Sequence, residues 1–169
     1  MTVFPLKRIS ASGVPAALQK AERYRLLNDS SAAESICRDI VEVEPDNQQA
    51  LIVLLLAITD QFADDLGDSV RRAREVLPRL RDEYKRAYYA GIICERRAKA
   101  QRRQSIPGSG SMAYESFREA MDWYERAEGM RPAGNDEAIL RWNTCARLLA
   151  SDDHLRPRPA EQYEPVLED

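Results

Sequence analysis

The sequence predicts an all-α protein built from pairs of short helices, and three observations lead to this fold class. The apolar residues follow a helical pattern almost throughout the 169 residues, whereas sustained period-two alternation is missing. Capping residues mark the starts of several helices. Three stretches also share one spacing of residues that ends in a proline, which indicates a repeated helical unit.

Helix starts can be read in order along the chain. Pro15 stands where a proline is favoured, in a first helical turn. Ser31 lies three residues before Glu34, and Asp46 lies three residues before Gln49, so each pair can form a capping box. These signals and the apolar pattern predict helices at residues 14–28, 32–44, 47–62, 66–79, 81–104, 112–130 and 135–151.

One spacing recurs in three of the expected helices. Its steps are four, three and five residues, and each set ends in a proline that stops the helix. The residues before the proline fall on one helix stripe. The sets are Ala33, Cys37, Ile40 and Pro45; Leu66, Val70, Ala73 and Pro78; and Ala120, Tyr124, Ala127 and Pro132.

This spacing resembles the tetratricopeptide repeat (TPR) family, whose unit of 34 residues carries Ala-x3-Phe-x2-Ala-x4-Pro in its second helix. The resemblance implies a right-handed stack of about three helix pairs plus a C-terminal solvating helix. It also implies that the first helices line a concave face that binds peptides or helices. The first helices resemble the family at Ala17, Lys20-Ala21 and Tyr24; at Ala87, Ala90-Gly91 and Cys94; and at Ala138, Arg141-Trp142 and Cys145.

The chain divides into an extension, a repeat domain and a tail. Residues 1–13 precede the first helix, and residues 14–150 form a single TPR-like domain. Residues 105–111 are rich in Ser, Gly and Pro, which predicts a loop inserted into the third repeat. Residues 152–169 form a Pro-rich acidic tail that we expect to be disordered. The repeats span about 14–47, 47–80 and 81–134, and the final helix spans 135–151.

Charge is unevenly distributed along the chain. The net charge is −3, but residues 71–103 carry a balance of +8 between acidic flanks of −5 and −6. This basic segment is either a docking surface for an anionic partner or a set of solvated helix faces attracted to acidic neighbours. Nucleic acid is the less favoured partner, because the chain is acidic overall and no aromatic stacking platform accompanies the arginines.

No constellation of an enzyme, cofactor site or metal site appears in the sequence. Glycine-rich phosphate loops and zinc-protease motifs are missing. The only histidine, His154, has no partner at motif spacing. Cys37, Cys94 and Cys145 fall on stripes that we expect to face the interior. We therefore expect no catalytic residue, no bound metal and no cofactor.

Compartment and membrane association follow from two further features. Three cysteines without a CxxC pair fit free thiols in a reducing compartment. Residues 1–10 lack the pattern of a signal peptide, and the longest apolar run, residues 50–58, is far shorter than a membrane span. These features predict a cytoplasmic protein without a membrane partner.

The implied function is a non-catalytic protein–protein interaction module. The candidate contact residues are Tyr88, Ile92 and Arg96, at four-residue steps on one helix, and Asn143 and Arg147 on the last helix. The expected partner is a protein or peptide, with an acidic segment or self-association as open options.

Two other functions stay open. The alternatives are a small export or assembly chaperone for a client protein and an RNA-binding adaptor that uses residues 71–103. The apolar run at residues 50–58 is also a candidate part of the inner surface. Within the apolar run 50–58, we expect Ile52 and Leu56 to lie nearest the inner surface.

Overall fold

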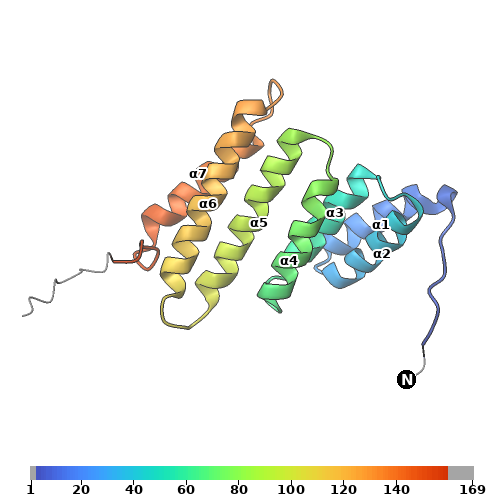
Figure 1. Cartoon of the computed structure of the whole chain (residues 1–169), viewed down its shortest axis with the longest axis horizontal. Coiled ribbons are helices and arrows are strands. Elements are labelled where there is room, and N and C mark those ends of the chain that lie inside the picture. The colour runs from blue at the N-terminus through green and yellow to red at the C-terminus, as the bar shows by residue number, and fades with distance from the viewer. Residues whose placement is uncertain (1–2, 160–169) are drawn as a thin grey trace, which may run out of the picture.

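The protein is helical throughout. The structure, a computed structural model, describes residues 3–159 and has seven α-helices, two short 3-10 helices and no strand in that range (Figure 1). Every expected helix is present with ends within three residues of the predicted ones, so the all-α class is confirmed. The helices are α1 (Val14–Leu26), α2 (Ser30–Val43), α3 (Gln48–Thr59), α4 (Leu66–Val76), α5 (Glu83–Arg103), α6 (Ser109–Met130) and α7 (Glu137–Ser151), with η1 (Ala11–Gly13) and η2 (Leu77–Arg79).

The helices form an elongated stack in chain order. Each α-helix packs against the next one along the chain, and α1 with α3 and α3 with α5 are also in contact. Figure 1 shows α1 and α2 at one end of the stack, with α6 and α7 at the other. Short connections reverse the chain between neighbours, so consecutive helices run antiparallel.

Side-chain caps start four of the helices, and two of them differ from the predicted positions. Ser31 and Asp46 were the expected caps of α2 and α3. Ser31 instead lies inside the first turn of α2, and Asp46 lies one residue before the cap of α3. The oxygen that accepts from the first-turn backbone must come from the residue just outside the helix. The caps of α2, α3, α4 and α5 are Asp29, Asn47, Asp65 and Asp82.

The repeated stripe lies in the core. Small residues of each set let neighbouring helices approach, and the larger ones fill the space between them. Helix α3 is apolar on nearly every side because other helices cover it before and behind. The buried members of the three sets are Ala33, Cys37, Ile40, Val70, Ala73, Ala120, Tyr124 and Ala127.

The loop predicted at residues 105–111 is helical in its last three residues. We predicted a loop over residues 105–111, but α6 begins at Ser109, and only residues 104–108 connect it to α5. Gly108 has a φ of 81°, which turns the chain, and the Ser109 hydroxyl donates to the carbonyl of Gln104 over 2.9 Å. Since α6 buries apolar side chains against α5 from Ala113 onward, packing favours an earlier start of α6 than composition predicts.

The start of the predicted tail is ordered. Leu155 is buried in the core formed by α5, α6 and α7, and Asp152 accepts from Arg102 on α5 over 2.7 Å. The backbone carbonyl of His154 lies directly against Gly110 on α6. These contacts hold residues 152–155 on the stack, which differs from the disorder predicted for this part of the tail. Residues 160–169 of that tail lie outside the described residues.

No helix in the described part of the chain combines the length and apolar character needed to cross a bilayer.

Candidate protein-interaction site

The three predicted contact residues on α5 occupy different environments. Ile92 is only 2% exposed, so its predicted role as a contact residue is wrong. Helices α3 and α7 flank α5 and bring Leu56 and Cys145 to the same core cluster, which covers Ile92. Tyr88 and Arg96 are half-buried, and each retains some surface.

Tyr88 is part of an aromatic cluster. Its ring stacks on Tyr84 with centroids 5.9 Å apart, and it meets Tyr89 edge-on at 5.1 Å. Burial raises the pKa of Tyr88, and it raises the pKa of Tyr89 to about 12. Both hydroxyls therefore remain protonated at neutral pH. Tyr88 and Tyr89 present half-buried rings, the kind of apolar surface with a polar end that interfaces use.

Arg96 belongs to a charge cluster that joins three helices. Asp60, at the C-terminal end of α3, accepts from Arg25 of α1 over 2.7 Å and from Arg96 of α5. Arg96 also donates to the hydroxyl of Thr59 over 2.9 Å. The side chains of Arg25, Asp60 and Arg96 are 23%, 21% and 24% exposed. Two guanidinium groups share one carboxylate, so the cluster keeps one surplus positive charge.

A second charge cluster joins α5, α6 and α7. Glu95, which is 1% exposed, accepts from the hydroxyl of Tyr124 over 2.7 Å and from Lys99 over 2.6 Å. Arg141 of α7 donates to the same carboxylate over 3.4 Å. Again two cations share one carboxylate.

Half-buried apolar side chains of α3 and α5 precede these two clusters along the same helices. Glu22 and Gln49 hydrogen-bond across α1 and α3, so one continuous surface runs over the odd-numbered helices. The half-buried state of Ile52 and Leu56 agrees with their expected place on it. We call this surface the odd-helix face; it comprises Leu18, Glu22, Arg25, Gln49, Ile52, Leu56, Asp60, Tyr88, Tyr89, Arg96 and Arg141.

The structure does not bring Asn143 and Arg147 to the odd-helix face. Asn143 lines a recess with Glu125 and Glu128 of α6. Arg147 is exposed and lies two residues, or about 200° of helical rotation, from the buried Cys145. The buried stripe of α7 therefore orients both predicted residues away from Tyr88.

Arg141, rather than the predicted Asn143 and Arg147, is the side chain of α7 on the odd-helix face. Its side chain lies beside the hydroxyl of Tyr88 as well as Glu95. The sequence did not predict a contact role for this residue, because its position depends on how α7 packs against α6 beside α5.

Most of the basic segment is paired with carboxylates. Seven of its twelve basic side chains form salt bridges, and most of their partners come from the acidic flanks. This favours the interpretation of helix faces attracted to acidic neighbours, and it leaves few free cations for a nucleic acid backbone. The paired side chains are Arg71, Arg72, Arg81, Arg96, Arg97, Lys99 and Arg102.

The cysteines lie in the interior, as predicted. Cys37, Cys94 and Cys145 are buried free thiols, and burial raises the pKa of each to about 12. The thiolate is therefore scarce at neutral pH. Within residues 3–159, no three His, Cys, Asp or Glu side chains gather where they could hold a metal ion.

Comparison with protein-family models, with curated proteins and with solved structures finds no match to this chain.

The Asp60 cluster predicts a pH dependence of stability. Desolvation acts to raise the pKa of Asp60, but the Arg25 hydrogen bond and the Arg96 charge outweigh it and hold that pKa below its usual 3.8. A carboxyl with a lowered folded-state pKa stabilises the fold above its unfolded pKa, and this contribution is lost as the pH falls. We expect Asp60→Asn to lower the free energy of unfolding by about 1 kcal/mol at neutral pH, an amount reduced by the partial exposure of the Asp60 side chain. Below about pH 4 the variant and the native chain should be equally stable.

Urea unfolding at a series of pH values measures this effect. Asp64→Asn is the matched control, because Asp64 is exposed and forms no salt bridge with the described residues. Equal unfolding curves for Asp60→Asn and the native chain at neutral pH would contradict the prediction.

Proposed function

We propose that this chain is a non-catalytic protein-interaction module with a TPR-like repeat stack, and that it binds a partner peptide or helix on the odd-helix face. One observation carries the proposal. Ile52, Leu56, Tyr88 and Tyr89 are half-buried apolar side chains on α3 and α5, the helices that also carry Asp60, Glu95 and Arg96 of the two charge clusters. Apolar anchors inside a polar rim are the usual anatomy of a protein-binding surface.

The packing of α5 on α6 supports a TPR-like stack. The resemblance aligns Gly91 with the family's glycine and Tyr124 with its phenylalanine, and these two residues are in direct contact. The contacts of α1 with α3, and of α3 with α5, also fit first helices that line one face.

The surplus charge favours a partner with acidic residues. Each cluster holds two cations and one carboxylate, so a partner carboxylate can approach Arg25, Arg96 or Arg141 without displacing the internal pairs. Charge at such a rim mainly speeds association and makes it sensitive to salt.

Capture of partners from extracts of the native host tests the proposal. Tyr88→Ala with Arg96→Glu should reduce the amount of partner retained by about tenfold or more, because an aromatic anchor is lost and a charge is reversed. Asn143→Ala with Arg147→Glu is the matched control, since it makes the same kinds of change away from the face. Thermal melting followed by circular dichroism checks that both variants are folded.

The outcomes separate the alternative functions. A stable protein partner that only the Tyr88 and Arg96 variant loses supports the proposal. A secreted client that needs this chain for its export would indicate the chaperone function instead. Material that disappears after nuclease treatment would indicate the RNA-binding adaptor. If the two double variants retain equal amounts of the partner, the odd-helix face is ruled out as the binding site.

A further inference from the structure

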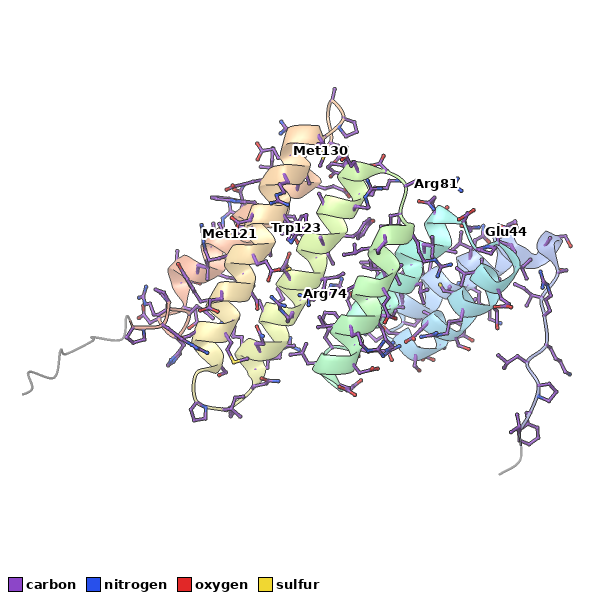
Figure 2. All side chains as sticks on the ribbon, in the orientation of Figure 1. Glu44, Arg74, Arg81, Met121, Trp123 and Met130 are labelled. Carbon is purple, nitrogen blue, oxygen red and sulfur yellow. The ribbon has the colours of Figure 1, made fainter. Side chains whose placement is uncertain are left out.

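An apolar groove lies between η2, α5 and α6, away from the odd-helix face. Its volume is about 610 Å³, within the range of pockets that bind ligands. On α5 the groove residues lie about a third of a helical turn round from Tyr89. Figure 2 shows Trp123 and Met130 of α6 on the side toward α5. The floor is Ala87 and Ala90, and the walls are Leu77, Pro78, Trp123 and Met130.

The chain shapes this groove through helix length and side-chain size. Helix α4 ends at Val76, and Pro78 lies in the 3-10 turn that follows, whereas α5 and α6 continue for 21 and 22 residues. Alanines on the floor leave space that larger side chains would fill. Trp123 and Met130 are seven residues apart on α6, so this wall is about 10 Å long, or two helical turns.

Two arginines line the groove without a carboxylate partner among residues 3–159, and a third such arginine lies on the neighbouring helix α4. They are Arg74, Arg86 and Arg126, and most other arginines of the described chain are paired. The Arg86 guanidinium donates to two backbone carbonyls. The Arg126 guanidinium lies over the ring of Trp123, 4.7 Å from its centroid.

Arg74 adds a positive charge on α4, outside the residues that line the groove. It is exposed on α4, and Figure 2 shows it between α4 and α5. Among the residues that line the groove, Arg86 and Arg126 stand against Glu83, the one acidic residue there. The rim therefore has a positive balance.

We infer that this groove docks an amphipathic helix of another protein that carries apolar anchors and acidic flanks. A helix with apolar residues at i, i+3, i+4 and i+7 presents a strip of two turns, which matches the length of the Trp123–Met130 wall. Its acidic residues meet the unpaired arginines, and tryptophan and arginine are the residues that most often anchor interfaces. This site is separate from the odd-helix face, so failure of either proposal leaves the other standing.

Fluorescence titration with matched peptides tests this inference. The full chain carrying Trp142→Phe keeps Trp123 as its single tryptophan, so Trp123 emission reports on the groove. The main probe is a synthetic amphipathic helix of about 15 residues with Leu on one face and Glu on the other. One control peptide replaces Glu with Lys, and a second replaces Leu with Ala. Fluorescence anisotropy of labelled peptides gives the affinities independently.

The expected result is saturable binding of the Leu and Glu peptide with a shift of Trp123 emission. Arg74→Glu with Arg126→Glu should weaken this binding by about tenfold or more, because two favourable charges become repulsive. Arg118→Glu with Arg147→Glu should change it less than about twofold, since these exposed arginines lie outside the groove. Melting curves establish that both double variants are folded.

Three results would overturn the inference. The first is that the Leu and Glu peptide does not bind, or that the Lys or Ala control peptide binds with the same affinity. The second is tighter binding of a peptide with the sequence of residues 160–169, which would assign the groove to the chain's own tail. The third is a dimer in sedimentation that Trp123→Ala abolishes, which would assign the groove to a second copy.

Discussion

Gly91→Val is expected to lower the free energy of unfolding by about 3 kcal/mol, a large share of the stability of a domain of this size. A Cβ atom at Gly91 would lie 2.7 Å from Cδ1 of Tyr124. Tyr124 is fully buried, and its hydroxyl donates to Glu95 over 2.7 Å. The ring cannot move aside without losing this hydrogen bond inside the core, so overpacking and a lost bond combine.

Gly129→Ala is the matched control for this change. Gly129 is also a helical glycine, but no atom lies within 4 Å of the place where its Cβ would be. The substitution should stabilise the chain by up to about 0.5 kcal/mol, because it reduces the freedom of the unfolded backbone. Urea unfolding followed by circular dichroism measures both variants. A Gly91→Val variant as stable as the native chain would mean that α5 and α6 do not approach so closely.

Local signals predicted the helices better than the loops between them. Capping residues and apolar spacing depend on nearby residues, so they placed each helix end to within three residues. The insertion at residues 105–111 has the composition of a loop, yet Ser109 to Ser111 are helical. Helix length there depends on packing between α5 and α6, which composition does not report.

The odd-helix face was predicted only in part, for a physical reason. A four-residue step places Tyr88, Ile92 and Arg96 on one stripe, but exposure depends on what the neighbouring helices cover. Ile92 is covered, and Arg141 arrives from a helix nearly 50 residues away in sequence.

One part of the face did have a sequence signal. Arg25 and Asp60 are 35 residues apart, and Asp60 and Arg96 are 36 residues apart. Each separation is close to the 34 residues of the proposed repeat, in which equivalent positions of consecutive first helices would come together. Opposite charges spaced by one repeat period therefore predict contact in a stack of this kind.

The second large effect is expected at Glu95. Its carboxylate is buried and accepts from Tyr124, Lys99 and Arg141, so it joins α5, α6 and α7. Glu95→Ala leaves the Tyr124 hydroxyl without its acceptor in the core and removes the counter-charge of two cations. Breaking a buried ion pair from one side costs about 3 to 5 kcal/mol. Because Lys99 and Arg141 retain access to water, we expect about 3 kcal/mol.

Three further variants separate the contributions to that loss. Glu95→Gln keeps an acceptor for Tyr124 but removes the charge, so it should cost less than Glu95→Ala. Tyr124→Phe removes one hydrogen bond while keeping the ring, at about 1 kcal/mol. Glu75→Ala breaks an exposed pair with Arg71 and should cost no more than about 0.5 kcal/mol.

The double variant Glu95→Ala with Tyr124→Phe completes the cycle and isolates the coupling between these two groups. If the hydroxyl left unpaired by Glu95→Ala carries part of the loss, the double variant should be more stable than the sum of the single losses predicts. Urea unfolding of all five variants supplies the free energies. Losses for Glu95→Ala and Glu75→Ala that agree within error would show that the buried carboxylate does not hold α7 on the stack. A large loss for Glu95→Ala, with strong coupling to Tyr124, would show that the buried carboxylate joins α5 to α6.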